Sequence, residues 1–405
     1  LEWVNENIET FNGDADNITI FGESAGGRNV MTLMTTSLTK DLFQRGIAQS
    51  GYLGSDSLDF AKSDPRSGSD GFIKDRIKIK YPDLSDNEIK EFMLNKDKII
   101  NFLRGLSSEE VISYYRMRDD TSELIDVPNV IPDGVVIPEK GIYGAFRDGD
   151  VHDKEMIFGT TRDEDKLFMF MNDYFVHKPL NFLSWLWPGF GMYVQPKDPK
   201  FYDLYAKYMA ESWKYGAVDL PSKFMSSTKD SNIYAYRFDW DEQPTEFGVP
   251  LSKLMGAAHA MEIGFIFKSA GLTGESDSYI TSSIYDPEKR ETDIKLANEI
   301  GEYWVNFAYD GNPSENPYSK DVKWLNWDTN NDKERFIVLD TVNDKGISMF
   351  NATLSADSIL QGIASEDLTI DQKCVIIDSM FNRTTLTQEE VDDIYLTFLN
   401  GKCLN

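Results

Sequence analysis

The pentapeptide Gly-Glu-Ser-Ala-Gly at residues 22–26 constrains the fold of this chain more than any other feature of its sequence. It follows an apolar segment at residues 18–21, which predicts a short buried strand of a parallel sheet, and a helical pattern begins at Gly26. A serine on a strained turn between strand and helix leaves no room for side chains two residues away, which explains Gly22 and Gly26. The order helix, strand, tight turn and helix indicates an α/β fold.

Other segments continue the same pattern of helices and strands. From the spacing of their apolar residues we predict helices at residues 1–11, 87–103 and 293–308, strands at 155–158 and 233–240, and a hairpin of 336–339 with 347–350. Residues 56–125 are polar and charged, and they predict an inserted or peripheral helical region. Because no repeat or low-complexity linker divides the chain, one large domain is admissible.

An aromatic, apolar stretch at residues 180–194 is interrupted by Pro188, Gly189 and Gly191. It predicts either a buried loop packed on the core or a wall or cap over an apolar substrate pocket. No apolar run in the chain reaches the roughly 18 residues that a membrane-spanning helix needs.

Composition excludes some classes of partner. The 405 residues include 41 basic and 68 acidic ones, a formal net charge of −27. Such a surface repels phosphate backbones and anionic membranes, so we expect no nucleic-acid partner. The two cysteines, Cys374 and Cys403, are too few for a disulfide scaffold or a thiolate metal site, and they could either pair or remain buried thiols.

A serine hydroxyl becomes a useful nucleophile only beside a base, and the chain has three histidines. His152 lies in an acidic connection, which predicts a solvated surface position, and His177 precedes Lys178-Pro179, which predicts a loop. His259 lies in a turn of small residues shortly after the strand predicted at 233–240. It is therefore the histidine best placed to reach the serine turn.

The base also needs a carboxylate that orients the imidazole and stabilises its cation. Asp163, Glu164 and Asp165 follow the strand predicted at 155–158, at its carboxyl end, where catalytic groups of open α/β sheets gather. Chemistry alone does not choose among the three, and a solvated charge cluster is the other interpretation. The chain order serine, acid, histidine agrees with that of the α/β-hydrolases.

These residues resemble the type-B carboxylesterases, a family that includes the cholinesterases. The matching segments run through most of the chain: residues 1–4, 7–8, 11–14, 17–27, 42–43, 49–51, 132–134, Gly159, 163–164, 256–257, His259, Glu262, Phe267, 303–304 and 306–308. The resemblance implies an α/β-hydrolase fold, a mostly parallel central sheet flanked by helices. It also implies that residues 1–405 are the C-terminal portion of one such domain, starting just before the nucleophile turn, with the N-terminal strands missing.

The resemblance also assigns roles. It implies Ser24 as nucleophile, Glu164 as the acid of the triad and His259 as general base. In addition, Glu23 would be the acidic neighbour of the nucleophile, Ser50 a serine supporting the triad, and the backbone amide of Ala25 one oxyanion donor.

Together these inferences predict a serine hydrolase that cleaves small-molecule carboxylic esters through an acyl-enzyme on Ser24, with no metal or cofactor. The alternatives are a lipase-like hydrolase with residues 180–194 as its cap, a non-catalytic cholinesterase-like binding protein, and an inactive fragment. Since the family's glycine-rich oxyanion loop lies upstream of residue 1, we expect these 405 residues alone to be poorly soluble or nearly inactive. The resemblance slightly favours a secreted or periplasmic protein.

Arg28 and Asp165 depart from the small residues usual in the family at these two positions. We expect the added negative charge of Asp165 to perturb Glu164.

Overall fold

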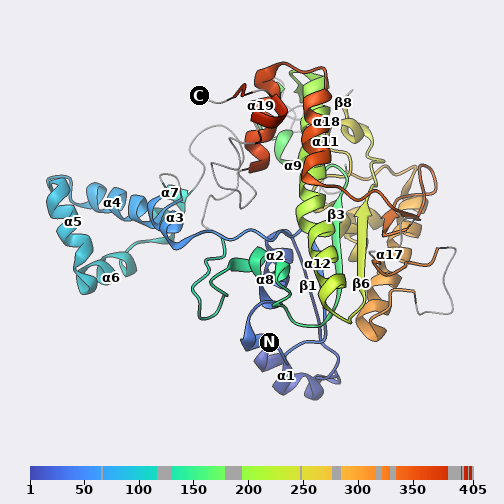
Figure 1. The fold of residues 1–405 in the computed structure, drawn as a ribbon, viewed down its shortest axis with the longest axis horizontal. Helices are drawn as coiled ribbons and strands as arrows, with labels where there is room; N and C mark the ends of the chain where they lie inside the picture. Colours follow the sequence, from blue (N-terminus) through green and yellow to red (C-terminus); the bar gives the residue numbers. More distant parts are fainter. Residues whose placement is uncertain are drawn as a thin grey trace.

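The computed structural model describes residues 1–64, 67–115, 129–177, 194–246, 249–275, 284–314, 322–328, 334–381, 394, 396–399 and 401–403. At its centre is a six-stranded sheet in the order β1-β2-β3-β6-β9-β10 (Figure 1). Its neighbouring strands pair in parallel except β10, which runs antiparallel to β9. The strands are β1 (Thr19–Glu23), β2 (Arg45–Gln49), β3 (Glu155–Thr161), β6 (Ile233–Phe238), β9 (Phe336–Leu339) and β10 (Ser348–Phe350).

Two further pairs of short antiparallel strands lie outside this sheet. They are β4 (Val176–His177) with β5 (Gln195–Pro196), and β7 (Thr245–Glu246) with β8 (Val249–Pro250).

Helices cover both faces of the sheet, because successive strand residues point to opposite sides. On β3, Met156 and Phe158 join one buried cluster and Ile157 joins another. The first cluster takes in α2 (Ala25–Leu33), α8 (Gly141–Arg147) and α12 (Leu220–Thr228). The second takes in α14 (Met261–Ile266), α15 (Ala270–Thr273) and α17 (Arg290–Asp310).

A third group of helices packs beyond the carboxyl ends of the strands (Figure 1). It consists of α9 (Lys166–Met169), α11 (Pro199–Lys214), α13 (Leu251–Leu254), α18 (Ala356–Ser365) and α19 (Ile370–Phe381). Short helical turns complete the described elements: α1 (Glu2–Asn7), η1 (Ile8–Phe11), η2 (Ser37–Thr39) and a π-helix, η4 (Tyr215–Asp219). In the described part of the chain, no helix combines the length and the apolar character needed to cross a bilayer.

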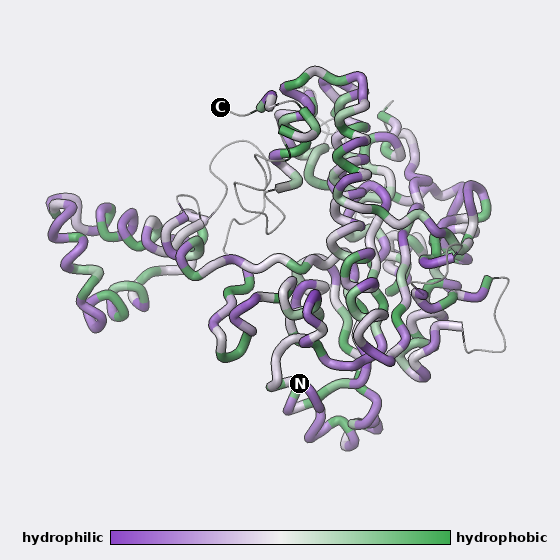
Figure 2. The backbone as a smooth tube through the Cα atoms, viewed as in Figure 1, coloured by the Kyte–Doolittle hydropathy of each residue, from purple (hydrophilic) through white to green (hydrophobic). Residues whose placement is uncertain are grey.

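A helical lobe projects away from the sheet, on the left of Figure 1. It contains α3 (Leu58–Ser63), α4 (Ser69–Lys80), α5 (Asp86–Leu94), α6 (Lys96–Arg104) and α7 (Ser108–Tyr115). Along these helices hydrophobic and hydrophilic residues alternate (Figure 2), and the hydrophobic ones form a small core of their own, with Ile77, Ile89, Phe92 and Phe102 buried. The prediction of a peripheral helical region is confirmed as far as residue 115.

The predicted strands at 155–158 and 233–240, the helix at 293–308 and the late hairpin are confirmed, and α17 ends at Gly311 in the left-handed conformation that a helix C-terminus favours. The helical segment at 87–103 is divided at Asn95 into α5 and α6, and residues 1–11 form α1 followed by the 3-10 turn η1. The burial of the first strand is a correction. The apolar pattern predicted a buried strand, whereas the missing upstream strands that the resemblance implies predicted an exposed apolar edge. β1 does lie at the edge of the sheet, and Phe21 is 48% exposed. Of the aromatic stretch at 180–194, residues 180–193 lie outside the described residues, so both interpretations of it stay predictions.

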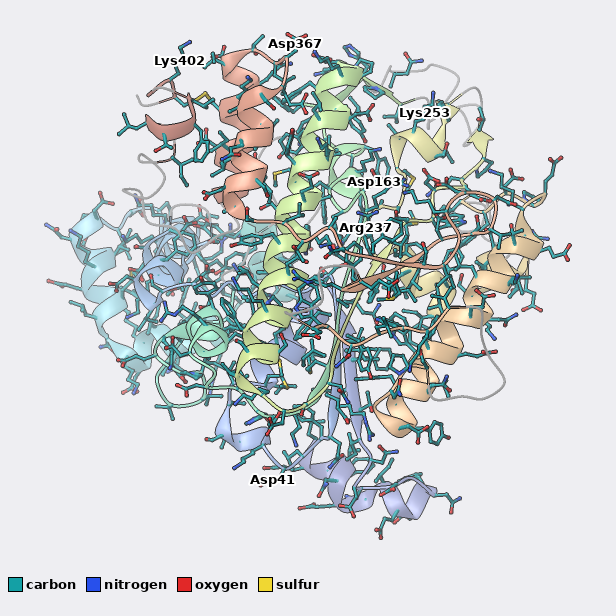
Figure 3. The ribbon with its side chains drawn as sticks, turned by 45° about the vertical axis from the view of Figure 1, so that its right-hand side comes forward. Asp41, Asp163, Arg237, Lys253, Asp367 and Lys402 are labelled. Atoms are coloured by element: carbon teal, nitrogen blue, oxygen red, sulfur yellow. A yellow bond between two sulfur atoms is a disulfide. The ribbon has the colours of Figure 1, made fainter. Side chains whose placement is uncertain are left out.

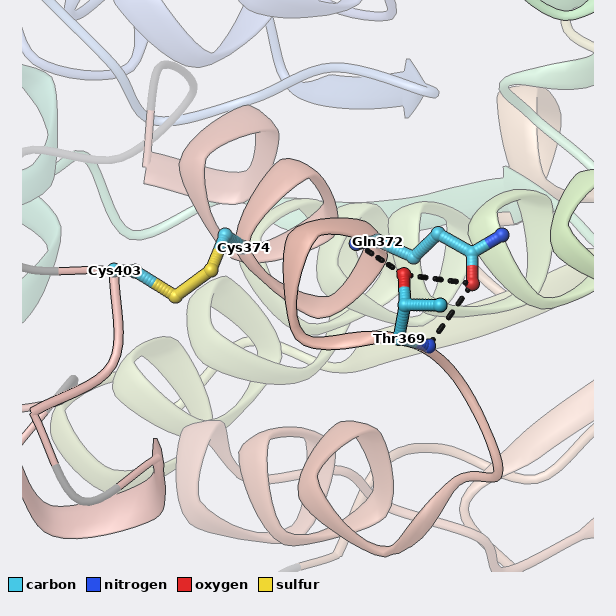
Figure 4. Close-up of a disulfide and its surroundings, with 4 residues drawn as sticks. All are labelled: Thr369, Gln372, Cys374 and Cys403. Atoms are coloured by element: carbon cyan, nitrogen blue, oxygen red, sulfur yellow. Dashed lines mark hydrogen bonds between the residues drawn. A yellow bond between two sulfur atoms is a disulfide. The ribbon is translucent and has the colours of Figure 1, made fainter.

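Cys374 and Cys403 form a disulfide, which resolves the choice between a pair and two thiols (Figure 4). The bond ties residue 403 to α19, and the start of that helix carries a reciprocal cap. There Thr369 Oγ1 accepts from the backbone amide of Gln372 at 3.2 Å, and the Gln372 side-chain oxygen Oε1 accepts from the backbone amide of Thr369 at 3.0 Å. Cys403 is therefore joined to a helix whose first turn is capped.

One buried ion pair joins α11 to the π-helix that follows it. Lys214 Nζ lies 2.6 Å from Asp219 Oδ1 and also donates to the Ala352 carbonyl at 3.1 Å. The other Asp219 oxygen accepts from the Leu354 amide at 2.8 Å. Burial raises the pKa of Asp219 and lowers the pKa of Lys214, so each charge depends on its partner.

Removing one member of this pair should therefore be costly. We expect Asp219→Ala to lower the free energy of unfolding by about 3–5 kcal/mol, because it leaves a buried ammonium without its counter-ion. Urea unfolding measures this loss. Lys78→Ala, which breaks the exposed pair with Asp86, is the control and should leave the midpoint unchanged. Equal effects of the two variants would show that the buried pair stabilises the protein no more than the exposed pair does.

Candidate active site

Ser24 occupies a strained turn between β1 and α2. Its backbone has φ 59° and ψ −116°, a conformation that a residue with a side chain rarely adopts and that costs about 1–3 kcal/mol. The Ser24 amide donates to the Gln49 carbonyl at 2.8 Å, which fixes the turn to the end of β2. The predicted strand, turn and helix are therefore present, with the serine at the tip.

The glycines around the turn differ in what they do. A Cβ on Gly22 would lie 2.6 Å from the Gly26 carbonyl carbon, and one on Gly27 would lie 2.5 Å from the Gln49 oxygen. A Cβ on Gly26 meets no described atom within 4 Å. The expectation that a side chain at Gly26 would clash is thus wrong, because the tight approach is made by its backbone.

This difference can be tested by two single substitutions. Gly22→Ala should destabilise the protein by about 1–3 kcal/mol, since rigid backbone atoms would have to move. Gly26→Ala should be neutral or stabilise by up to about 1 kcal/mol, because alanine favours a helix over glycine. Thermal unfolding of both variants measures the difference in stability. A destabilised Gly26→Ala protein would contradict the finding that a Cβ at residue 26 meets no described neighbouring atom.

Glu164 is the most enclosed carboxylate of the site. It follows β3, it is fully buried, and its Oε1 accepts from Ser50 Oγ at 2.6 Å, Thr160 Oγ1 at 2.6 Å and the Thr161 amide at 2.7 Å. Burial raises its pKa, but the His259 charge and these hydrogen bonds outweigh burial and lower it. Glu164 is therefore held as an anion inside the protein.

His259 lies between two carboxylates. Its Nδ1 is 2.5 Å from Glu164 Oε2, and its Nε2 is 3.2 Å from Glu23 Oε1. Two half-buried aromatic rings pack against the imidazole, with centroid distances of 4.9 Å for Trp213 and 5.4 Å for Phe168. Both ring nitrogens thus face acid, and the two aromatic rings, which stack on each other at 6.4 Å, lie beside the imidazole.

The charge around the imidazole sets its protonation. Burial lowers the pKa of His259, but the carboxylates of Glu164, Glu23 and Glu262 outweigh burial and raise it to about 9. Burial, followed by the neighbouring carboxylates, raises the pKa of Glu262 to about 7. For Glu23, burial raises the pKa to about 7 although the His259 charge opposes it. The acids around His259 therefore favour the protonated form of the imidazole.

Glu262 has no role in the sequence-based assignment, but it belongs to this group. It is buried on α14, and its Oε1 accepts from the Tyr236 hydroxyl at 3.1 Å and from the Gln49 side chain at 3.4 Å. Its place among the residues that match the family is the signal in the sequence that could have pointed to it.

Two predictions about the other histidines need correction. His152 is half-buried rather than solvated, with Nε2 2.9 Å from the Thr36 carbonyl, and burial lowers its pKa. His177 lies in the short strand β4 rather than in a loop, and it is exposed.

The acidic trio after β3 is not a solvated cluster. Asp165 is buried, and Asp163 pairs with Arg162 at 2.8 Å and with Lys166 at 3.2 Å. Arg28, which departs from the family pattern, bonds Tyr52 and Asn129 and lies over the Tyr52 ring at 4.7 Å. The expected perturbation of Glu164 by Asp165 stays a prediction.

The structure thus brings Glu164, His259, Glu23 and Ser50 into one contact network. Ser24 adjoins it through the chain, but among the described residues no hydrogen bond joins Ser24 to His259. Ala25 is the first residue of α2, so its amide has no acceptor within the helix. No group of three or more histidine, cysteine or acidic residues in the described ranges is arranged to hold a metal ion.

Comparison with known sequences places this site in context. A sequence model of the Carboxylesterase family matches residues 1–182 and 190–353. The para-nitrobenzyl esterase of Bacillus subtilis (strain 168) is 30% identical over 349 residues, covering 84% of this chain and 62% of that protein. The human cocaine esterase is 25% identical over 338 residues, covering 78% and 53%. The chain therefore spans little more than half the length of these relatives.

Comparison with solved structures gives the same fold. A PNB esterase structure superposes with a TM-score of 0.58 over 89% of this chain and 65% of that one, at 24% identity. The mostly parallel sheet flanked by helices is thus the α/β-hydrolase fold that the sequence predicted.

Proposed function

The chain belongs to the carboxylesterase family, and on this basis we propose that the protein hydrolyses small carboxylic esters through an acyl-enzyme on Ser24. The observation that carries the proposal is the series of contacts from Ser50 through Glu164 to His259, beside a serine on a strained turn. A buried anion on one imidazole nitrogen leaves the other to handle protons, which is the arrangement that activates a serine.

The reaction then has two similar halves. His259 Nε2 takes the hydroxyl proton of Ser24 while Oγ attacks the ester carbonyl, and the Ala25 amide donates to the developing oxyanion. The imidazolium returns its proton to the departing alcohol, which leaves an acyl group on Ser24. Water then attacks the acyl carbon with the same base, and the carboxylic acid is released. Glu164 stays ionised and stabilises the imidazolium.

Glu23 competes with Ser24 for the imidazole in the resting arrangement. Since Nε2 faces Glu23 Oε1 at 3.2 Å, the ring has to leave this contact and lose its proton before it can serve as a base. Hydrogen bonds of catalytic groups often tighten only when substrate is bound. The Glu23 contact is therefore a resting contact that substrate binding displaces.

Removing the Ser24 hydroxyl tests the nucleophile. We expect Ser24→Ala to lower kcat for a nitrophenyl ester by up to about 10⁶-fold relative to the wild-type protein, without loss of stability. Ser63→Ala, which removes a hydroxyl in the helical lobe, is the control and should hydrolyse the ester at the wild-type rate. A Ser24→Ala protein with half the wild-type rate would refute the proposal.

The acids around His259 give the reaction a characteristic pH dependence. Only the neutral imidazole can accept a proton, and its pKa is raised to about 9, so kcat/KM should increase as pH rises through about 9. A pH profile of ester hydrolysis, corrected for spontaneous hydrolysis, measures the midpoint. A midpoint near the ordinary histidine value of about 6.5 would show that the surrounding carboxylates do not raise the pKa of His259.

Neutralising one of the carboxylates around His259 should move the midpoint of this pH profile. Because the Glu23 charge raises the pKa of His259, Glu23→Gln should shift the profile to lower pH. Glu9→Gln makes the same charge change at an exposed position of η1 and should leave the profile where it is. Identical profiles for both variants would show that Glu23 does not act on the imidazole.

A further inference from the structure

Two loops at the carboxyl end of the sheet are joined backbone to backbone. One follows β3 and carries Asp163 and Glu164, and the other precedes α14 and carries Ala257 and His259. The Asp163 amide donates to the Ala257 carbonyl at 2.9 Å, and the His259 amide donates to the Glu164 carbonyl at 3.3 Å. The acid and the histidine thus come from segments that are held to each other directly.

The Asp163 side chain adds a further contact between these loops. Its Oδ2 accepts from the Ala257 amide at 3.1 Å, and a Cβ on Gly256 would lie 2.4 Å from the same oxygen. Gly256 also has φ +56°, so only glycine lets the backbone turn here without strain. The Asp163 carboxylate therefore contacts the Gly256-Ala257 turn that leads to His259.

Neighbouring side chains fix both members of this contact. Arg162 and Lys166 hold Asp163, and although burial raises its pKa, their charges outweigh burial and lower it. The turn is held by donors to its carbonyls: Gln243 Nε2 on Gly256 at 2.6 Å, Tyr202 Oη on Leu254 at 2.7 Å, and Lys166 Nζ on Lys253 at 3.2 Å. Asp163 and Lys253 are labelled in Figure 3, both in the upper part of that view.

We propose that Asp163 is a positioning residue that sets the contact between Glu164 and His259 by clamping the Gly256-Ala257 turn. In the described part of the chain Asp163 forms no hydrogen bond or ion pair with the imidazole, so it acts through the backbone of both loops. A misplacement of about 1 Å at a reacting group can cost about 10²-fold in rate, which makes such a clamp consequential. The kinetic part of this proposal rests on the ester hydrolysis proposed above, whereas its geometric part does not.

The first test measures the His259 pKa by NMR, which needs no ester turnover. The charged groups facing the imidazole are Glu164 after β3, Glu23 on β1 and Glu262 on α14, and the Glu164 contact depends on the clamp. In Asp163→Ala the midpoint should fall from about 9 towards the ordinary value, because the hydrogen bond to Glu164 loosens. Asp163→Asn retains an oxygen that can accept from Ala257, so it should keep most of the raised midpoint.

Asp239→Asn is the matched control. Asp239 is also buried beside an arginine and a lysine, Arg237 at 2.6 Å and Lys345 at 2.9 Å, but neither its side chain nor these partners bind the histidine turn. It should lower stability without moving the His259 midpoint. A fall in midpoint equal to that of Asp163→Ala would overturn the clamp, and so would an unchanged midpoint in Asp163→Ala.

The second test is kinetic. Asp163→Ala should reduce kcat about 10- to 100-fold with a smaller change in KM, and Asp163→Asn should recover most of this loss. Where Asp163→Ala does not fold, Gly256→Ala perturbs the clamp from the other side and should give the same fall in the His259 midpoint. If the wild-type protein hydrolyses no ester while Asp163→Ala still lowers the midpoint, the proposed function fails and the clamp stands. If wild type is active and neither variant shifts the midpoint, the clamp fails alone.

Discussion

The contact of 2.5 Å between Glu164 and His259 depends on more of the fold than any other contact in the site. It requires β3 to end beside β2, so that Ser50 can donate to the buried carboxylate, and it requires a turn after β6 to return across the same edge. A lone carboxylate buried this deeply would be expensive, and its three donors together with the imidazole offset that cost. The parallel sheet thus serves to bring these loop ends together.

The surplus of acid around one imidazole distinguishes this site from a simple pair. The His259 charge and hydrogen bonds hold Glu164 ionised, whereas burial and mutual repulsion raise the pKa values of Glu23 and Glu262 to about 7. Like charges at close range cannot all be ionised cheaply, so protons are shared within the group. The protonation of His259 and of these acids is consequently a property of the whole cluster.

Local features of the site could be predicted from the sequence, and features that depend on tertiary contacts could not. Ser24 and its turn follow from neighbouring residues, because strand, glycine and helix signals adjoin one another. Choosing Glu164 from three adjacent acids required the family resemblance, since all three follow the same strand and only packing separates them. The contact of Glu23 with His259 joins residues more than 200 positions apart, and no local pattern indicates it.

The errors have equally physical causes. An apolar strand such as residues 18–21 looks the same in sequence whether another strand pairs with it or not, so its pattern alone predicted burial of Phe21, and only the family resemblance predicted an exposed edge. The clash assigned to Gly26 belongs to its backbone, which approaches Gly22. Both features depend on what lies across the fold rather than along the chain.

Reaction of the protein from its native source with a fluorophosphonate, followed by peptide mass spectrometry, tests the central claim most directly. An activated serine displaces fluoride and retains the phosphonyl group, whereas an ordinary serine hydroxyl does not react. We expect one adduct, on Ser24, and no adduct in a Ser24→Ala protein. Ester hydrolysis without labelling of Ser24, or labelling of another residue that abolishes hydrolysis, would contradict it.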